Sequence, residues 1–557
     1  MKKIYDKTLA QLCLDSSNKY KNLPALTMLS DGKISRSITY SVFGKRAQQI
    51  GALLKKTGLV KGGKVMLLSD NCPEWAVFYF GISFAGAVSV PLLTGFSAEQ
   101  IEHIAIHSGI SAVCLGQNAA EKIEQAENRS FFEKLPLIYI DSINSEEETA
   151  EITVSINGEK KLMRLDQTVD SNFISEQNPE ELATIIYTSG TSGSSKGVML
   201  SGRNIISCAY SCIKFVNLTT RDRLLSVLPL AHSYECTIGL LIPLIAGSSI
   251  TYIDKPPSQS VLLPAVKAVR PTIMLTVPLL IEKIYFNVVA PKLKNNQLYK
   301  FPFTRSLAIR FAGKKVMKAF GGCIRFFGIG GAPLSAEVES FLHRARFPYA
   351  IGYGLTECAP LIAGNAPLHS TVGSAGTAPE GVSLRIGKCD VQCGANEGEI
   401  QVYGPNNMIG YYNDEKRTKE AFTEDGWLRT GDLGFIDKKK RVFVRGRLKA
   451  LILGPSGENI YPEEIEGLLG SSQLVEDALV YSGKRGELVA IVCLTDAAKT
   501  AAVAIEQTLE ELRAWVNKKL ADFSRLSRIE IRYEPFEKTP TMKIKRYLYV
   551  PGTALVV

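Results

Sequence analysis

Short apolar runs of strand length alternate with helix-like segments along the first part of this 557-residue chain. The run "KVMLLSD" (64–70) precedes a helical stretch that starts at Pro73, and "AVSVPL" (87–92) and "SAVCLG" (111–116) follow. Such alternation is typical of parallel sheets with helices on their faces. We therefore predict an α/β fold with largely parallel sheets. The length allows two to four domains or subdomains.

One apolar segment, residues 75–93, is nineteen residues long and has no charge, which approaches the length of a membrane span. The capping, proline and glycine residues in and beside this segment favour a buried helix and strand instead. Asp70 or Asn71 can cap a helix, Pro73 suits the first turn, and Gly86 can end it. The "AVSVPL" run then reads as a short buried strand.

A loop rich in glycine and hydroxyl residues surrounds Lys196 in the stretch "YTSGTSGSSKGVML" (187–200). Backbone amides and hydroxyls in such loops donate hydrogen bonds to anionic oxygens, so the stretch predicts a phosphate-binding loop. It is not a Walker A loop, because Ser195 precedes the lysine and Gly197 follows it. We expect a loop from Thr188 to Gly197 between two strands, with Ser201 capping the next helix.

Charge is unevenly distributed along the chain, whose net charge is +10. Residues 141–181 are polar and acidic and predict a surface excursion. Residues 283–336 carry ten Lys or Arg and no Asp or Glu. Within that segment, basic residues recur at helical spacing beside apolar ones: Arg310, Lys314 and Lys318 beside Ile309, Val316 and Phe320. The segment could bind anionic lipid, form a solvated face or neutralise a phosphorylated ligand. No nucleic-acid recognition motif accompanies it, so we expect no nucleic-acid partner.

Seven further motifs follow the loop in a fixed order over the rest of the chain. They are "LPLAHSYE" (228–235), "GIGGAPL" (328–334), "GYGLTE" (352–357), "GEIQVYGP" (398–405), "GWLRTGDLG" (426–434), "GRLKALILGPSGENIYPEEIE" (446–466) and "TPTMKIKR" (539–546). In this order they resemble the adenylate-forming superfamily of acyl-CoA synthetases, luciferases and peptide-synthetase adenylation domains. The resemblance covers essentially the whole chain.

The resemblance implies a nucleotide site. An enzyme that joins a carboxylate to a nucleotide must hold ATP and neutralise charge at the α-phosphate. The β- and γ-phosphates would be held by the loop residues Thr188, Ser189, Gly190, Thr191, Ser192, Gly193 and Lys196. The adenine pocket would be formed by Gly331, Ala332, Pro333, Tyr353 and Gly354, with the tyrosine stacked on the base. Asp432 would accept hydrogen bonds from both ribose hydroxyls, and Arg447 would add a ribose or phosphate contact.

The remaining implied roles concern the chemistry. Thr356 would touch the α-phosphate, and Glu357 would bind Mg²⁺, which prefers oxygen ligands. His232 would lie near the acyl carboxylate. Lys543 matches the family's catalytic lysine, whose cation would bridge the attacking carboxylate and the α-phosphate.

The resemblance also implies a division of the chain. Lys449 matches the hinge about which a small, mobile C-terminal α+β domain rotates after acyl-AMP forms. We expect an AMP-binding domain over residues 1–447, a hinge at 448–449 and a C-terminal domain over 450–557 that carries Lys543.

Two features are similar to the long-chain fatty-acid branch of the superfamily: Met542 before the catalytic lysine, where most members have glycine, and the basic segment 283–336. We expect a fatty-acid CoA ligase that uses ATP, Mg²⁺ and coenzyme A. Two alternatives stay open, namely acyl transfer to the phosphopantetheine of an acyl carrier protein and a nucleotide- or membrane-binding module without turnover.

The polar N-terminal sequence "MKKIYDKTLAQLCLD" has no signal-peptide pattern, and the eleven cysteines are scattered without C-x-x-C pairs. We therefore expect reduced thiols and a cytoplasmic protein. Peripheral association with the inner face of the membrane is an open alternative.

Overall fold

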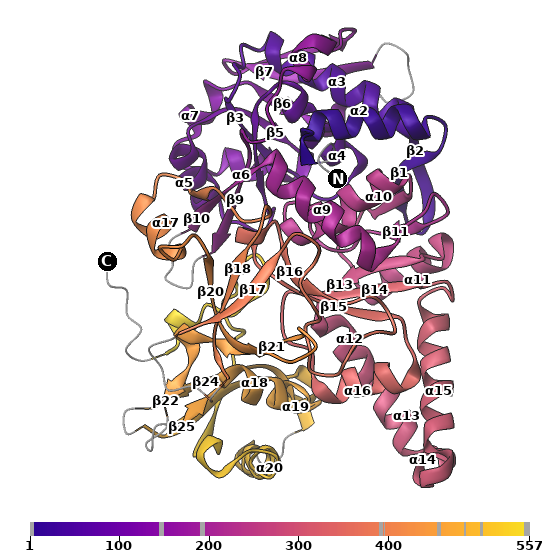
Figure 1. Ribbon diagram of the computed structural model, residues 1–557, viewed down its shortest axis with the longest axis vertical. Coiled ribbons are helices and arrows are strands. Elements are labelled where there is room, and N and C mark those ends of the chain that lie inside the picture. Colours follow the sequence, from indigo (N-terminus) through magenta and orange to yellow (C-terminus); the bar gives the residue numbers. More distant parts are fainter. Residues whose placement is uncertain are drawn as a thin grey trace.

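Two large sheets form the upper part of the molecule, and a smaller region lies below them (Figure 1). The computed structural model describes residues 5–143, 150–189, 195–388, 394, 396–453, 458–483, 486–501 and 505–550. The larger sheet runs in the order β19 (Gly410–Tyr411), β10 (Ser195–Ser201), β9 (Leu182–Ser189), β4 (Val88–Leu92), β3 (Lys64–Leu68), β5 (Ile110–Leu115), β6 (Leu137–Tyr139), β7 (Ala150–Ile156) and β8 (Glu159–Leu165). The second runs in the order β16 (Leu361–Gly364), β15 (Tyr349–Gly354), β14 (Phe326–Gly330), β13 (Ile273–Thr276), β11 (Arg223–Leu225), β12 (Ser249–Ile253), β1 (Pro24–Ser30) and β2 (Lys33–Thr39).

The centres of both sheets are parallel and their edges are antiparallel. In the larger sheet β9, β4, β3, β5 and β6 pair in parallel, whereas β10, β7 and β8 are antiparallel additions. The second sheet is parallel from β15 to β1. The predicted α/β class is confirmed, with antiparallel edges that the sequence pattern did not indicate.

The uncharged segment 75–93 forms the helix α4 (Pro73–Phe84) and the buried strand β4, as predicted. Helix α4 contacts β3 and β4 of the larger sheet and β1 of the second, so it is apolar on all sides because protein surrounds it. Among the described residues, no helix is both long and apolar enough to cross a membrane.

The predicted cap of α4 was wrong. The N-cap is Cys72, which makes no side-chain cap. Asp70 instead accepts hydrogen bonds from Thr94 and Asn118. The amide of Asn71 donates to the Leu228 carbonyl, at 2.6 Å, and accepts from the Leu230 amide. Asn71 therefore fixes the backbone of the "LPLAHSYE" motif rather than the helix.

The predicted acidic surface excursion was also wrong in part. Residues 144–149 lie outside the described part of the chain, but β7 and β8 form a hairpin that extends the larger sheet. Ala150, Ile152 and Val154 are fully buried on one face of β7. Their alternation with polar residues is the strand signal that the acidic composition hid.

Helices fill the space between the sheets and cover their outer faces. They are α2 (Leu9–Tyr20), α3 (Tyr40–Lys56), α4, α5 (Ala98–Ser108), α6 (Gln117–Glu124), α7 (Arg129–Glu133), α8 (Ser171–Ser175), α9 (Gly202–Val216), α10 (Ile242–Ala246), α11 (Gln259–Val269), α12 (Pro278–Ile284), α13 (Ala290–Lys294), α14 (Gln297–Lys300), α15 (Pro302–Ala319), α16 (Ala336–Ala345) and α17 (Glu415–Ala421). Two π-helical turns, η2 (Glu235–Leu241) and η3 (Tyr285–Val289), continue directly into α10 and α13. Ser201 caps α9 in a capping box with Asn204, as predicted.

The last part of the chain forms two smaller units. An antiparallel sheet contains β17 (Ser383–Gly387), β18 (Gly398–Tyr403), β20 (Leu428–Ile436) and β21 (Val442–Arg447). After the turn η5 (Leu448–Ala450) and the short pair β22 (Ile452–Leu453) and β23 (Asn459–Ile460), a sheet of β24 (Val475–Ser482), β25 (Leu488–Leu494) and β26 (Arg528–Arg532) packs with α18 (Pro462–Gly470), α19 (Asp496–Ala501) and α20 (Ile505–Asn517). The predicted small C-terminal α+β region is therefore present.

Candidate active site

The strands that flank the predicted phosphate loop pair further toward it than expected. Strand β9 continues to Ser189 and β10 begins at Ser195, with Lys196 paired opposite Thr188. The predicted contacts Gly190, Thr191, Ser192 and Gly193 lie outside the described residues, as does the side chain of Ser189. Thr188 and Lys196, which were expected in the loop, are therefore both held in the β-ladder.

Lys196 lies in a strongly charged setting. Its ammonium group lies 4.9 Å from the ring centroid of Tyr411 on β19. Burial lowers the pKa of Lys196, and the neighbouring cations Arg417 and Lys449 lower it further, whereas Glu357 opposes them. Three cations, Lys196, Arg417 and Lys449, thus lie near the carboxylates of Glu357 and Asp414, and this excess of cations suits a polyanion.

Glu357 lies in the turn η4 (Thr356–Cys358), which follows β15 and begins at Thr356. Its carboxylate accepts a hydrogen bond of 2.9 Å from the Tyr411 hydroxyl, and its carbonyl accepts from the Met408 amide. Burial and this carboxylate raise the pKa of Tyr411. The sequence analysis did not predict Tyr411 as a site residue. The only local feature that marks it is its position directly after Gly410.

Gly354 has a steric reason to be glycine. A Cβ at this position would lie 2.0 Å from the Pro360 carbonyl oxygen. The chain can therefore fold back directly after β15 and present Thr356 and Glu357 at the carboxyl end of the strand, where ligands bind in open α/β sheets.

Asp432 is the most enclosed of the predicted site residues, with 3% of its surface exposed. It pairs with Arg447 across β20 and β21, where its carboxylate meets the guanidinium at 2.9 Å. The Tyr353 hydroxyl donates to the same carboxylate at 2.6 Å. Burial raises the pKa of Asp432, and Arg447 and Tyr353 oppose that rise. The structure thus brings together three residues from two different sheets.

The three predicted adenine-pocket residues after β14 are exposed. Gly331 has φ +89°, and a Cβ there would meet only Val277, at 3.7 Å. The backbone is therefore accessible at Gly331, Ala332 and Pro333, as a flat ligand approaching it requires.

His232 follows the segment fixed by Asn71, and its Nδ1 accepts a hydrogen bond of 3.2 Å from the Tyr234 amide. Burial lowers the pKa of His232 to about 4, and the nearby Lys543 ammonium contributes to the shift. His232 is therefore neutral at physiological pH, and its ring lies within the electrostatic range of a residue 311 positions later.

Lys543 ends a tight turn in which the Thr539 amide donates to the Lys543 carbonyl at 2.7 Å and the Thr539 hydroxyl accepts from the Lys543 amide. By surface area the residue is exposed, but its ammonium group lies within electrostatic range of charged groups from both parts of the chain. Desolvation lowers its pKa and Arg447 adds to this, whereas Glu463 and Asp432 oppose it. Glu463, at the start of α18, was also missed by sequence reasoning.

Contacts hold the C-terminal region against the rest of the chain. The side-chain amide of Gln473 donates to the Phe286 carbonyl at 3.1 Å. Pro540 lies so close to Gly95 that an added Cβ would contact it at 3.4 Å. Lys449 lies in η5, the single short turn that joins β21 to this region.

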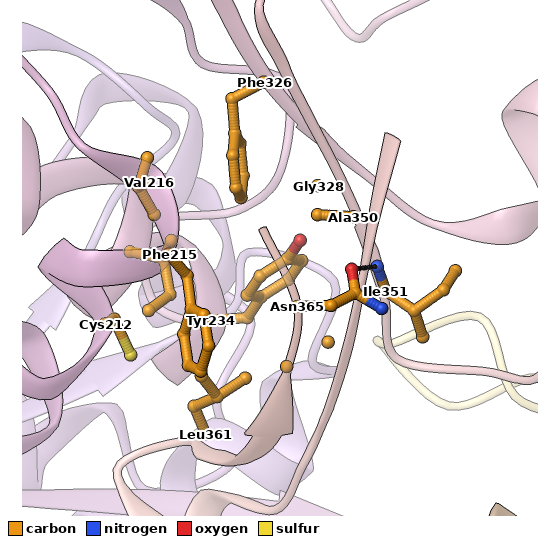
Figure 2. Close-up of a pocket in the computed structure, with 13 residues that line it drawn as sticks. Cys212, Phe215, Val216, Tyr234, Phe326, Gly328, Ala350, Ile351, Leu361 and Asn365 are labelled. Atoms are coloured by element: carbon orange, nitrogen blue, oxygen red, sulfur yellow. Dashed lines mark hydrogen bonds between the residues drawn. The ribbon is translucent and has the colours of Figure 1, made fainter. Parts of the chain in front are cut away.

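A small apolar cavity is lined in part by Tyr234, two residues after His232 in the sequence (Figure 2). Its volume is about 30 Å³, and thirteen residues line it: Cys212, Phe215, Val216, Tyr234, Ile238, Phe326, Gly328, Ala350, Ile351, Gly352, Leu361, Gly364 and Asn365. None is charged, and the Asn365 side chain is engaged by the Ile351 amide at 3.1 Å. The cavity therefore offers apolar contacts between α9, η2 and the strands β14, β15 and β16.

These groups fit a magnesium nucleotide. Glu357 supplies an oxygen ligand of the kind Mg²⁺ prefers, Lys196 supplies a cation for phosphate oxygens, and Asp432 supplies a buried acceptor for hydroxyls. The accessible backbone at Gly331 provides a surface for a planar base.

Comparison with known proteins also indicates a nucleotide-binding enzyme, over most of the chain. A family model described as AMP-binding enzyme matches residues 14–412, and one described as AMP-binding enzyme C-terminal domain matches residues 464–543. The chain is 29% identical to the long-chain-fatty-acid–CoA ligase heimdall of Drosophila melanogaster, over 91% of this chain and 79% of that one. It is 28% identical to 4-coumarate–CoA ligase 3 of Oryza sativa subsp. japonica, over 97% and 91%.

Among solved structures, the fold is similar to that of the O-succinylbenzoate CoA synthetase MenE from Bacillus subtilis in complex with AMP. The TM-score is 0.73 at 22% identity, and the match covers 97% of each chain. That protein has the same arrangement of a large N-terminal and a smaller C-terminal domain. By the extent of the family match, this chain belongs to the AMP-binding enzyme family.

Proposed function

We propose that this AMP-forming acid–CoA ligase activates a long-chain fatty acid. Adenylate-forming CoA ligases use ATP, Mg²⁺ and coenzyme A. The observation that carries the proposal is that Lys543, from the C-terminal region, lies within electrostatic range of His232, Asp432 and Arg447.

In the first step a carboxylate oxygen of the fatty acid attacks the α-phosphorus of ATP. The bond from that phosphorus to the bridging oxygen breaks, and pyrophosphate leaves with acyl-AMP as the other product. Lys543 and Thr356 stabilise charge on the α-phosphate, and His232 lies beside the acyl carboxylate. Because His232 is neutral, it can donate or accept a hydrogen bond without adding charge.

The nucleotide is held by residues on the larger part of the chain. Thr188, Lys196 and the loop between them bind the β- and γ-phosphates. Asp432 and Arg447 hold the ribose, and Tyr353, Gly354 and the 331–333 backbone hold adenine. Glu357 would bind Mg²⁺, which neutralises phosphate charge when bound.

In the second step the thiolate of coenzyme A attacks the acyl carbon, the carbon–oxygen bond to AMP breaks, and acyl-CoA and AMP leave. Lys543 has no role in this second step, but its ammonium group lies near His232, Asp432 and Arg447. We propose that residues 450–557 rotate about a hinge at 448–449 relative to residues 1–447. The short turn η5 supports this, because few backbone angles would need to change.

The apolar walls of the cavity support an acid with a hydrocarbon body. The relatives include ligases named for fatty acids and for 4-coumarate, and both acids have such bodies. A cavity of about 30 Å³ has room for about one water molecule, so an acyl chain must widen it. The π-helical turn η2 supplies Ile238 to its wall, and such turns recur at functional sites. Met542 supports the fatty-acid branch by resemblance.

We place the enzyme in the cytoplasm, in peripheral association with the inner face of the membrane, where long-chain fatty acids are dissolved. The free thiols among the described residues, most of them buried, suit a reducing compartment.

The test is pyrophosphate release with fatty acids of 4 to 18 carbons and with 4-coumarate, each with and without coenzyme A. We expect the highest kcat/KM with long chains and acyl-CoA as product. A higher kcat/KM with 4-coumarate than with long-chain fatty acids would contradict the proposed substrate. Turnover with an acyl carrier protein but not with coenzyme A would contradict coenzyme A as the acyl acceptor. Pyrophosphate release without any acid would contradict the assignment as an acid–CoA ligase.

A further inference from the structure

We propose that the outward face of α14 and α15 docks the protein on an anionic lipid bilayer. This face, called here the α15 face, carries apolar side chains at Leu298, Phe301, Phe303, Leu307 and Phe311 and cations at Arg310, Lys314 and Lys318. The proposal rests on the peripheral membrane association proposed above and assigns it to one surface; because docking is measured without fatty acid, ATP or coenzyme A, it can fail separately from acid activation.

The members on α15 share one face of the helix. Positions 303, 307, 310 or 311, 314 and 318 follow one another at intervals of three or four residues, which places them on one side. The opposite side packs into the core through Ala308, Ile309, Gly313 and Val316.

This arrangement corrects one sequence-based expectation. Ile309, Val316 and Phe320, which the sequence pattern placed with the cations on a possible lipid face, are 5–6% exposed and belong to the core. The apolar residues that face outward are the phenylalanines and Leu307. Helix α15 thus carries apolar residues on both sides, and those on the outward side are not covered by any described residue as those on the inner side are.

The packed side is held closely. A Cβ at Gly313 would lie 2.6 Å from the Cβ of Ala345 on α16, so the two helices approach at glycine distance. The α15 face therefore points outward from a fixed helix rather than from a loose segment.

The exposed apolar side chains are unusual for a surface helix. Phe303 is 100% exposed, Phe301 61%, Phe311 50% and Leu307 49%. Exposed apolar groups that cluster in one place mark interaction sites, whereas isolated ones need no explanation. These four occur within eleven consecutive residues.

Within the described part of the chain, the cations of the α15 face have no acidic partner. Among the described residues, no carboxylate oxygen lies within 4.0 Å of Arg310, Lys314 or Lys318. The Lys314 ammonium lies 5.9 Å from the Phe311 ring centroid, so cation and aromatic side chain are neighbours. Lysine and arginine beside aromatic rings can reach lipid headgroups while the rings enter the acyl boundary.

Position separates the α15 face from the nucleotide site. Helices α14 and α15 form the lower right corner of Figure 1, away from β20 and β21, which carry Asp432 and Arg447. The cations therefore do not neutralise the bound nucleotide. A helix face that is only solvated would not require a fully exposed phenylalanine such as Phe303. An acidic protein partner would account for the cations but not for Phe303.

The test is cosedimentation of the full-length protein with vesicles of phosphatidylcholine containing 30% phosphatidylserine, and with vesicles of phosphatidylcholine alone. We expect binding to the anionic vesicles at low salt and release as salt rises, because charge is screened over about 10 Å at 0.1 M. R310Q/K314Q/K318Q should weaken binding roughly a hundredfold. F303S/F311S should weaken it about tenfold or more, since apolar area would no longer enter the lipid.

Two control variants match these changes elsewhere on the surface. K438Q/K439Q/K440Q removes the same charge from an exposed turn, and I34S/L162S removes two exposed apolar side chains. Both should bind vesicles within about twofold of the wild type. All four variants should unfold at the wild-type temperature, because none of the changed residues is buried.

Three results would overturn the docking proposal: no binding by the wild type, equal loss in a control and its matched variant, or unchanged binding of F303S/F311S. Capture of an acidic acyl carrier protein by the wild type but not by R310Q/K314Q/K318Q, without vesicle binding, would assign the face to that partner. None of these results bears on acid activation, which pyrophosphate release measures separately.

Discussion

The pair Asp432 and Arg447, which we propose holds the ribose, and the Lys543 turn are built in opposite ways. Asp432 is buried, paired across two strands with Arg447 and hydrogen-bonded by Tyr353. Lys543 lies on an exposed turn whose hydrogen bonds are internal, and among the described residues its side chain has no hydrogen-bond partner. A group needed in both steps benefits from a fixed position, whereas a group needed in one step must be able to leave. We infer that Asp432 serves both half-reactions and Lys543 only the first.

The largest effect that this comparison predicts is on adenylation in Lys543→Ala. Removal of one preorganised charge from a transition state costs about 10²- to 10³-fold in rate. Fatty-acid-dependent pyrophosphate release should fall by that factor, with folding unchanged because the residue is exposed. Lys545→Ala, on the same segment, is the control and should retain most activity. Wild-type release by Lys543→Ala would remove the residue from the mechanism.

Asp432→Ala should have the next largest effect. Hydrogen bonds to a charged group contribute roughly 1.5–3 kcal/mol, so the KM for ATP should rise about ten- to a hundredfold. Discrimination between ATP and its dideoxyribose analogue should shrink. Asp432→Asn, which keeps an acceptor, should lie between the two. Discrimination equal to that of the wild type would place the ribose elsewhere.

Lys449→Pro tests whether the Lys543 turn has to leave. Proline fixes φ, so it should restrict rotation at η5. It should trap the arrangement in which Lys543 lies near Asp432 and Arg447. Acyl-AMP should accumulate, and acyl-CoA formation should fall about tenfold or more, as expected when a conformational step limits turnover. Lys449→Arg leaves φ free, keeps the cation near Lys196 and should turn over normally. Equal rates in the two folded variants would argue against a hinge here.

The smallest expected effect is on the titration of His232. Its pKa of about 4 reflects burial first and the Lys543 charge second. Lys543→Ala should therefore raise this pKa but leave it below the ordinary value of 6.5. NMR titration of the five histidines can follow it. An unchanged value would mean that Lys543 spends little time beside His232 in solution.

The same shift has a consequence for stability. Because the folded-state pKa lies below the ordinary value, neutral His232 contributes stability that is present above pH 6.5 and is lost as the pH falls toward 4. The pH dependence of the melting temperature in that window should be shallower in His232→Gln.

Local signals in the sequence predicted much of the fold and the outline of the site. Pro73 at the start of α4, the buried strand β4 and the Ser201 cap all depend on neighbouring residues. The order of the glycine-rich motifs predicted which segments would meet. Asp432, Arg447 and Tyr353 do meet, as do Lys543 and His232.

What the sequence did not predict depends on partners far along the chain. Tyr411 reaches Glu357 because β19 pairs with β10, and no local pattern encodes that pairing. Asn71 looked like a helix cap, but its side chain bonds to residues 157 and 159 positions later. The acidic composition of residues 141–181 led to the prediction of a surface excursion where β7 and β8 form. The alternation of apolar and polar residues that buries Ile152 and Val154 was the relevant signal.

The most direct test of the comparison is thioesterification of supplied acyl-AMP by coenzyme A, measured in Lys543→Ala and Asp432→Ala side by side. Lys543→Ala should form acyl-CoA at nearly the wild-type rate. Asp432→Ala should require a higher acyl-AMP concentration, because the ribose is bound in both steps. Equal loss of both half-reactions in Lys543→Ala, or normal acyl-AMP use by Asp432→Ala, would contradict the account.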